Sequence, residues 1–349
     1  ILLIMIPFII LSFCLSLISM PIIIKLCDKY RIYDYQSSRK IHSGDISRLG
    51  GIGIAFSFFV STTFFLIFSQ KISFISYLPF VFASLIIFIF GLIDDILTLK
   101  AIVKLFVQLI AVSIVVFTGN RFKQIGPWEL PIIVSYILTF CWIIGVINAF
   151  NLIDGLDGLC GSLSFTTITT VGILYLLAGN NESSFCVIFA ASILGFLCFN
   201  WPPAKLFMGD SGSQFLGFMI AVIPLFDSNN ILEHNKFLII VTLSAFPIFD
   251  TIAAIWRRIR DKRPIMSPDK AHLHHKLLNL GYTKNTVLYL VAFIQIILCF
   301  LVVLSYFLGT LKGSMILLLS LSFITLFFTF IHYTNKTVLQ KKELDNKSE

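Results

Sequence analysis

Eleven apolar stretches, each near the length needed to cross a lipid bilayer, constrain this chain more than any other feature of its sequence. A soluble domain is about 45–50% apolar and about 25% charged, whereas this chain is 57% apolar and 13% charged. The stretches show no strand alternation, and lipid cannot satisfy an open backbone. We therefore predict an all-α polytopic membrane protein with about eleven transmembrane helices. The stretches lie near residues 1–24, 49–69, 77–93, 101–118, 130–147, 161–178, 185–199, 214–226, 237–256, 286–308 and 314–332.

The distribution of basic residues predicts the orientation of these spans. Of the 26 Lys and Arg residues, 21 fall in one alternating set of loops and in the C-terminal segment, and 5 fall in the other set. Because cytoplasmic loops are enriched in Lys and Arg, the N-terminus is expected outside and the C-terminus in the cytoplasm. The net charge of +8 then reports topology and not nucleic-acid binding.

We expect one transmembrane catalytic domain over residues 1–332, since no internal repeat or second domain is visible, and a polar, frayed cytoplasmic tail over 333–349. The seven cysteines form no CxxC pair and are expected to act as small buried hydrophobes.

Acidic, amide and histidine residues gather at the predicted cytoplasmic ends of the spans. The first group is the adjacent pair Asp94 and Asp95, which ends an apolar stretch and is followed by Lys104. Two neighbouring carboxylates at such a position repel each other and lose solvation. They therefore indicate a metal site or a general base, and Lys104 is placed to pair with a phosphate. A solvated helix end is the alternative interpretation.

A second group repeats oxygen-bearing side chains every three residues, at Asn148, Asn151, Asp154 and Asp157. On a helix Asn151, Asp154 and Asp157 share one broad face, and carboxylate and amide oxygens suit Mg²⁺ better than zinc or copper. A third group is Gly209-Asp210-Ser211-Gly212-Ser213, in which Asp210 is a candidate metal ligand and the small residues a candidate phosphate cradle.

The longest basic loop contains a histidine motif, His272-Leu273-His274-His275, after Asp269. Imidazoles beside several arginines suit a pyrophosphate, and we expect the histidines and Lys104 to supply positive charge. A zinc site and a loop held by anionic lipid are the alternatives. The first basic loop, with Arg39, Lys40, His42 and Arg48, is a weaker signal that a basic stop to the first span also explains.

Together these motifs resemble the polyprenyl-phosphate N-acetylhexosamine-1-phosphate transferases. The resemblance rests on five stretches in the same order: GLIDDILTLKAIVK (91–104), NAFNLIDGLDGL (148–159), FMGDSGS (207–213), PIFDT (247–251) and DKAHLHHKLLNLG (269–281). It implies an Mg²⁺-dependent enzyme, with Mn²⁺ as a substitute, whose active site faces the cytosol from the bacterial inner membrane. It also implies transfer of a sugar-1-phosphate from a UDP-N-acetylhexosamine to undecaprenyl phosphate, with release of UMP. The lipid-linked product would start a cell-envelope polysaccharide such as O-antigen.

The resemblance implies a role for each matching residue. Asp94 and Asp95 match the catalytic aspartate pair, and Asn151 and Asp210 match the Mg²⁺ ligands. The residues that match substrate-binding positions are Lys104, Asp154, Asp157, His272, His274 and His275.

Several questions stay open on the sequence alone. The interrupted histidine motif resembles the branch that uses UDP-GlcNAc, and the phospho-MurNAc-pentapeptide transferase branch is the alternative. The exact hexosamine, the polymer that is made and a homodimer are not determined, nor is the choice between direct attack and a covalent aspartyl-phosphate. An ion-coupled transporter is the alternative of a different class, although its charges would lie near mid-span.

Overall fold

The chain folds into a bundle of α-helices with two minimal hairpins. The computed structural model describes residues 2–34, 46–69, 74–226, 235–264, 269 and 271–348. The helices are α1 (Leu2–Tyr30), α2 (Gly50–Ser69), α3 (Phe74–Leu97), α4 (Ala101–Phe117), α5 (Ile132–Ile153), α6 (Leu159–Leu177), α7 (Ser183–Asn200), α8 (Gly209–Val222), the 3₁₀ turn η1 (Ile223–Leu225), α9 (Lys236–Leu243), α10 (Ala245–Arg260), α11 (Leu273–Asn279), α12 (Lys284–Phe307) and α13 (Gly309–Ser348). The antiparallel hairpins pair β1 (Tyr33–Asp34) with β2 (Ile46–Ser47), and β3 (Gln124–Ile125) with β4 (Trp128–Glu129).

All eleven predicted stretches are helical. Among the described residues, eight helices are long and apolar enough to cross a membrane, and a ninth span arises if α9 and α10 count as one. The stretches near 101–118 and 214–226 form the shorter helices α4 and α8, of 17 and 14 residues. The all-α membrane architecture is thus confirmed, whereas the number eleven and the orientation stay predictions.

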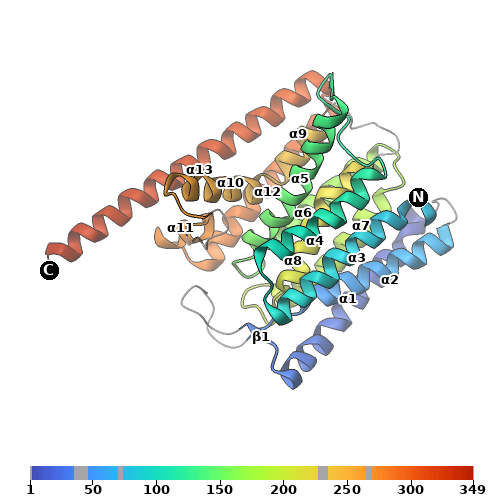
Figure 1. Ribbon diagram of the computed structural model, residues 1–349, viewed down its shortest axis with the longest axis horizontal. Coiled ribbons are helices and arrows are strands. Elements are labelled where there is room, and N and C mark those ends of the chain that lie inside the picture. The colour runs from blue at the N-terminus through green and yellow to red at the C-terminus, as the bar shows by residue number, and fades with distance from the viewer. Residues whose placement is uncertain are drawn as a thin grey trace.

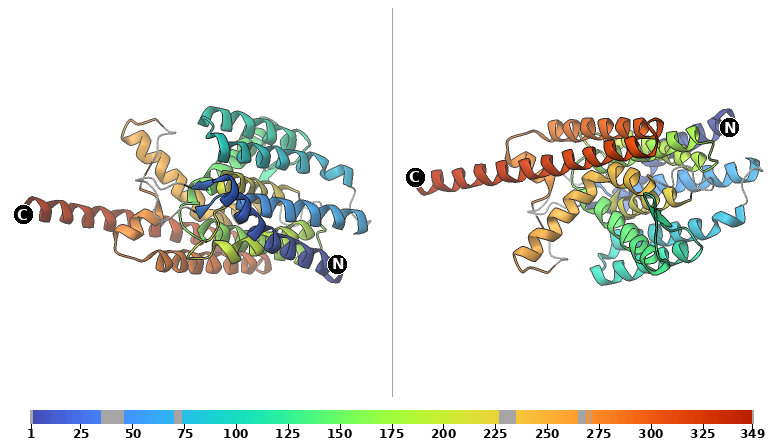
Figure 2. Two further views of the ribbon diagram at one scale, coloured as in Figure 1. Left: turned by 90° about the horizontal axis from the view of Figure 1, so that it is seen from below. Right: turned by 90° about the horizontal axis from the view of Figure 1, so that it is seen from above.

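Two features of the C-terminal half depart from a simple bundle. The α9 and α10 helices meet at a bend of 77°, and in both views of Figure 2 α10, drawn in gold, points away from the bundle. The α13 helix continues unbroken to Ser348 and extends past the other helices in Figure 1. The prediction of a frayed tail from residue 333 is therefore wrong, because the apolar helix propagates into the polar segment.

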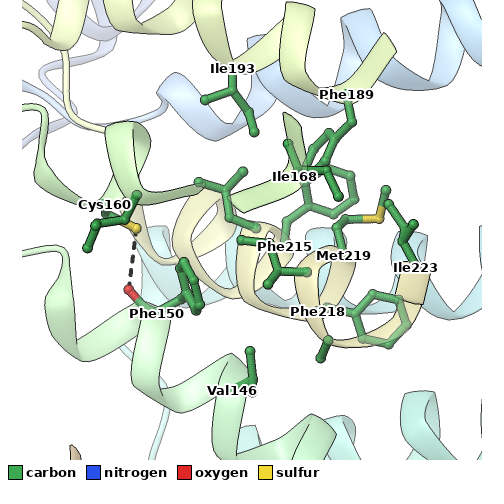
Figure 3. Packing of buried hydrophobic residues seen from close by; sticks show 14 of the residues in the cluster. Val146, Phe150, Cys160, Ile168, Phe189, Ile193, Phe215, Phe218, Met219 and Ile223 are labelled. Atoms are coloured by element: carbon green, nitrogen blue, oxygen red, sulfur yellow. Dashed lines mark hydrogen bonds between the residues drawn. The ribbon is translucent and has the colours of Figure 1, made fainter. Parts of the chain in front are cut away.

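The short helix α8 lies at the centre of the bundle. It packs against α2, α3, α5 and α6, and every residue from Ser211 to Val222 is buried. Figure 3 shows Phe215 of α8 facing Phe189 of α7, with ring centroids 5.6 Å apart. A helix of 14 residues spans only about 21 Å. It can stay short because protein, not lipid, surrounds it.

Close backbone packing between α3 and α8 depends on Gly91. A Cβ atom built on Gly91 would lie 2.6 Å from the Cα atom of Ser211, closer than real Cβ contacts. This contact sets the C-terminal end of α3, with Asp94 and Asp95, directly against the first turn of α8.

We predict that Gly91→Ala destabilises the folded protein, because the added methyl group pushes α3 away from α8. Overpacking of this kind costs about 1–3 kcal/mol. Thermal unfolding of the purified protein in detergent should show a lower midpoint.

The matched control is Gly145→Ala, because a Cβ on this α5 glycine meets nothing within 4 Å. The control should leave the midpoint unchanged or raise it slightly, since alanine favours a helix. Equal midpoints for the two variants would contradict the packing argument.

Candidate active site

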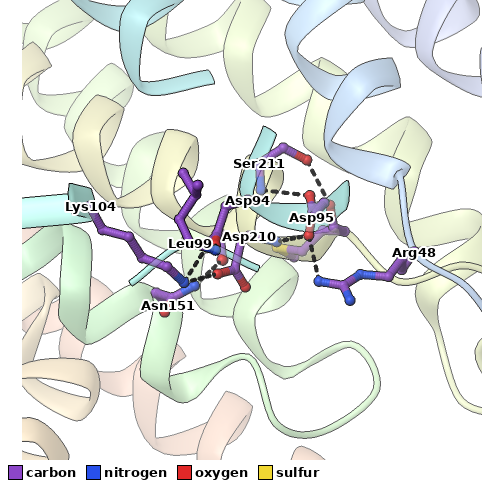
Figure 4. Close-up of polar contacts among 10 residues, drawn as sticks. Arg48, Asp94, Asp95, Leu99, Lys104, Asn151, Asp210 and Ser211 are labelled. Atoms are coloured by element: carbon purple, nitrogen blue, oxygen red, sulfur yellow. Dashed lines mark hydrogen bonds and ion pairs between the residues drawn. The ribbon is translucent and has the colours of Figure 1, made fainter. Parts of the chain in front are cut away.

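The two adjacent aspartates at the end of α3 have different partners. Successive residues on a helix point about 100° apart, so Asp94 and Asp95 face different neighbours. The Asp95 carboxylate accepts the backbone N–H groups of Asp210 at 2.8 Å and Ser211 at 2.9 Å. It also accepts a 2.8 Å hydrogen bond from Nη2 of Arg48 (Figure 4). Asp95 therefore holds the first turn of α8 in place.

Asp94 instead faces a cation and a second carboxylate. Its Oδ1 atom accepts the N–H of Leu99 at 2.7 Å, and its Oδ2 atom forms an ion pair with Lys104. The Lys104 ammonium also bonds Oδ2 of Asp210 at 2.8 Å. The Asp94 side chain is 2% exposed, whereas the side chains of Lys104 and Asp210 are 27% and 29% exposed. The open side of this cluster is thus formed by Lys104 and Asp210.

The turn that presents Asp210 requires glycine before it. Gly209 has a φ of +73°, a left-handed conformation that side chains disfavour, and a Cβ there would lie 2.4 Å from the carbonyl oxygen of Arg48. Asp210 follows at the start of α8, where the helix dipole favours negative charge. The same partial positive charge suits a phosphate.

Asn151 lies in the last turn of α5, beside Asp210 in Figure 4, and its Nδ2 donates to Ser213 Oγ at 2.9 Å. Asp94 and Asp210 carry oxygens that contact the Lys104 ammonium, and with Asn151 beside Asp210 they form an oxygen-rich donor set. Among the residues that the structure describes, no three His, Cys, Asp or Glu side chains form a ready metal cage.

This donor set fits Mg²⁺. That ion commonly binds one or two carboxylates and keeps water or substrate phosphate as its other ligands. A positive charge already occupies the space between Asp94 and Asp210, so these carboxylates are arranged to share a cation.

The loop after α5 joins this cluster to the histidine motif. Asp154 ends α5, and Asp157 accepts the N–H of Ala204 at 3.1 Å, which ties the loop to the segment before α8. A Cβ on Gly155 would lie 2.8 Å from the His274 ring, so ring and loop are in contact. Gly155 is four residues from Asn151, which limits their Cα separation to about 14 Å.

Asp250 of α10 holds the histidine motif in place. Its Oδ2 atom lies 2.8 Å from Nδ1 of His272, and its Oδ1 atom accepts the N–H of Leu273 at 2.8 Å. Asp269 makes a second tether, because Nη2 and Nε of Arg257 bond its Oδ2 atom at 2.6 and 3.0 Å. Burial would raise the pKa of Asp269, but these bonds from Arg257 outweigh it and lower the pKa.

Burial, with the nearby charge of His275, lowers the pKa of His274 to about 3. The His274 ring is therefore neutral near pH 7, and neither of its nitrogens has a hydrogen-bond partner. In the substrate-free protein this histidine therefore supplies no positive charge near pH 7, and its nitrogens are available for hydrogen bonds. Burial, with the charge of Arg257, also lowers the pKa of Lys276 to about 8, so this lysine carries charge at pH 7.

The structure thus brings Asp94, Lys104, Asn151 and Asp210 together and connects them, through Gly155, with His274. Sequence reasoning missed the partners of these residues. Arg48 was treated as a basic stop, Asp250 was noted only within the PIFDT stretch, and Arg257 only as one of the arginines beside the imidazoles. An aspartate in an otherwise apolar span is the signal that could have identified Asp250. The other basic-loop candidates, Arg39, Lys40 and His42, lie outside the described residues.

Comparison with known proteins identifies relatives over most of the chain. Residues 77–226 match the model of the family described as glycosyl transferase family 4. A probable undecaprenyl-phosphate N-acetylglucosaminyl 1-phosphate transferase of Bacillus subtilis (strain 168) is 35% identical over 302 residues, which cover 82% of each chain. A decaprenyl-phosphate N-acetylglucosaminephosphotransferase of Mycobacterium leprae is 30% identical over 76% of this chain and 75% of that protein. An undecaprenyl-phosphate alpha-N-acetylglucosaminyl 1-phosphate transferase of Yersinia pestis is also 30% identical, with the same coverage.

We predict that Lys104→Met lowers the unfolding midpoint of the substrate-free protein, because Asp94 and Asp210 then face each other without a cation. Loss of one partner from a partly exposed cluster should cost about 1–3 kcal/mol, less than for a fully buried pair. Thermal unfolding in detergent measures the change.

The double variant Lys104→Met/Asp94→Asn should recover most of this loss, since the repulsion between carboxylates is then removed. A double variant as unstable as the sum of the two single variants would contradict the role of Lys104 as a shared counter-charge.

Proposed function

Because this chain belongs to the family of polyprenyl-phosphate N-acetylhexosamine-1-phosphate transferases, we propose that it transfers N-acetylglucosamine-1-phosphate from UDP-GlcNAc to undecaprenyl phosphate. The names of its relatives support the sugar and the lipid acceptor. The observation that carries the proposal is the cluster of Asp94, Lys104 and Asp210 at the first turn of α8. The lipid-linked product then starts a cell-envelope polysaccharide.

The reaction joins two anions, so neutralisation of charge is the main task of the site. An oxygen of the lipid phosphate attacks the β-phosphorus of the UDP-sugar. The bond from that phosphorus to the bridging oxygen breaks, and UMP leaves. Lys104 and the N-terminus of α8 supply positive charge on the open side of the cluster. Lys104 is thus placed to bind phosphate oxygens of either substrate.

Asp94 is the residue placed to orient the acceptor phosphate or to accept its remaining proton. One of its oxygens is held by the N–H of Leu99, while the other faces Lys104. Because the second pKa of a phosphate monoester is near 6, little proton remains to be removed at pH 7. Asp95 acts by positioning Asp210 and Ser211, since its oxygens accept their N–H groups.

Asp210 and Asn151 would hold Mg²⁺, or Mn²⁺ in its place. The ion would supply charge neutralisation at the diphosphate and at the departing UMP. His274, in contact with Gly155, presents uncharged ring nitrogens on the side of the loop that carries Asp154 and Asp157. These residues would contact the nucleotide and sugar of the donor.

The excess of Lys and Arg residues in the loops at this end supports a site that faces the bacterial cytoplasm. This position lets a soluble nucleotide-sugar meet a phosphate whose polyprenyl chain stays in the membrane.

Purified protein with UDP-GlcNAc, undecaprenyl phosphate and Mg²⁺ should release UMP and form the lipid-linked diphospho-sugar. Mass spectrometry of the lipid product and an assay of UMP measure the two products. UDP-MurNAc-pentapeptide should not be turned over; turnover of that donor alone would assign the chain to the other branch of the family. Ion flux through vesicles without any UMP release would favour a transporter.

Asp210→Asn should reduce UMP release at least about 100-fold, because loss of the carboxylate weakens both the metal site and the contact with Lys104. The exposed Asp261, which pairs with Arg260 and Arg263 at the end of α10, offers the matched control Asp261→Asn with near-normal activity. Retained activity of Asp210→Asn with unchanged Mg²⁺ dependence would refute the assignment.

Asp250→Asn should lower kcat about 10–100-fold, because an amide cannot accept both the His272 and the Leu273 hydrogen bonds. If Asp250 acts by positioning His272, the substitution has little further effect in a His272→Ala background. Multiplicative losses in the double variant, measured as kcat and KM separately, would show that the two residues act independently.

A further inference from the structure

A polar cavity lies at the end of the bundle opposite the carboxylate cluster. Its volume is about 300 Å³, and its lining comes from the start of α3, the segment after α4, the residue before α7, the end of η1 and the start of α9. In Figure 1 this is the end at which α9 is labelled. Tyr77 of the cavity and Asp94 of the active site lie on the same helix, 17 residues or about 26 Å apart. The cavity is therefore separate from the site described above.

Basic side chains gather at this cavity. Arg121, Lys123 and Lys236 all line it. They are three of the five Lys and Arg residues that the sequence places on this side of the membrane. The four other loops and chain ends on this side carry only two further Lys or Arg residues. The gathering of three at one cavity therefore points to a negatively charged ligand.

The cavity also contains one buried carboxylate. Glu182 is 3% exposed, and its Oε1 atom accepts a 2.7 Å hydrogen bond from the hydroxyl of Tyr77. Among the described residues that line the cavity, three positive side chains outnumber this one carboxylate. This excess of positive charge suits a phosphate group, which carries one negative charge as a diester and about −1.5 to −2 as a monoester at pH 7.

The arginine in the wall is held in place before any ligand arrives. Nη1 of Arg121 donates to Oγ of Ser135 at 2.7 Å, and its guanidinium carbon lies 5.2 Å from the centroid of the Tyr136 ring. The next residue, Phe122, is 2% exposed and packs against Trp142. A guanidinium has five N–H donors, so the bond to Ser135 leaves donor capacity for an anion.

The size and polarity of the cavity suit a phosphate with a small substituent. A water molecule takes up about 30 Å³ in the liquid, so the cavity has room for a headgroup-sized ligand. Hydroxyl and amide side chains of Thr118 and Asn120 add further hydrogen-bonding groups to the wall. Helix ends of a membrane bundle lie at the depth of lipid headgroups, which makes lipid phosphates as accessible here as soluble ones.

From this geometry we infer that the cavity lined by Arg121, Lys123 and Lys236 is a second anion site, which binds a phosphate group at the face opposite the transferase site. The phosphate belongs either to an anionic lipid headgroup or to a soluble phosphate. Bound there, it joins α3, α4 and α9 through one set of charge-assisted hydrogen bonds.

Two titrations of the full-length protein in uncharged detergent distinguish the sources. One uses inorganic phosphate at constant ionic strength, and the other uses dihexanoyl phosphatidylglycerol against dihexanoyl phosphatidylcholine. The unfolding midpoint reports binding, and native mass spectrometry counts bound lipid. A rise with phosphatidylglycerol alone identifies a lipid ligand, and a rise with inorganic phosphate identifies a soluble one.

The variant Lys123→Gln/Lys236→Gln should weaken the binding about tenfold or more. Lys312→Gln is the matched control, because Lys312 follows Thr310, which contacts Asn235 at this same end, but does not line the cavity. Lys104→Gln removes the phosphate contact of the transferase site and should leave this binding unchanged.

Absence of binding by either ligand would overturn the inference. So would equal weakening by Lys312→Gln, or loss of binding in Lys104→Gln with retention in Lys123→Gln/Lys236→Gln. None of these measurements uses catalytic turnover, so their outcome is independent of the proposed transferase activity.

Discussion

The hydrogen bonds of the Asp95 carboxylate to the first turn of α8 are the constraint on which the site depends. Asp95 accepts N–H groups from Asp210 and Ser211 and a bond from Arg48, so one side chain connects α3, α8 and the segment before α2. These N–H groups would otherwise be unsatisfied at the helix start. With α8 held in this way, Asp210 is brought to Lys104, and Asp94 is left to face the same cation. The two adjacent aspartates thus differ in their contacts: Asp95 positions the first turn of α8, and Asp94 faces the Lys104 ammonium.

The central place of α8 explains how a charged cluster is built against an apolar bundle. Because α8 is enclosed by other helices, its N-terminus lies within protein rather than lipid, and its dipole favours the negative charge of Asp210. Gly91 and Gly209 permit the close backbone contacts that this arrangement requires. The exposed sides of Lys104 and Asp210 then form the open approach to this cluster.

The histidine motif is a second rigid unit, and its rigidity comes from α10. Asp250 binds both His272 and the backbone of Leu273, while Arg257 binds Asp269. The contact of His274 with Gly155 joins this unit to the end of α5. A donor that extends from a diphosphate at Lys104 to a sugar or base near His274 would contact both units. The 77° bend before α10 turns the chain away from the apolar bundle, so that α10 can contact and hold this motif.

The sequence by itself determined the helical membrane architecture, because long apolar runs in lipid must satisfy their backbone hydrogen bonds within a helix. It also determined the family, because five polar motifs occur in the order typical of that family. It also determined which polar residues are unusual, since a carboxylate at the end of an apolar span costs solvation free energy. Only the tertiary structure decided that Asp95 holds α8, that Asp250 holds His272, and that His274 is neutral. Those roles depend on burial and on partners 22 to 116 residues away in the sequence. The periodicity of residues along one helix indicates neither. Arg48 shows the reason most clearly: a basic residue after an apolar span has a sufficient local explanation, and only the packing of α3 against α8 reveals its carboxylate partner.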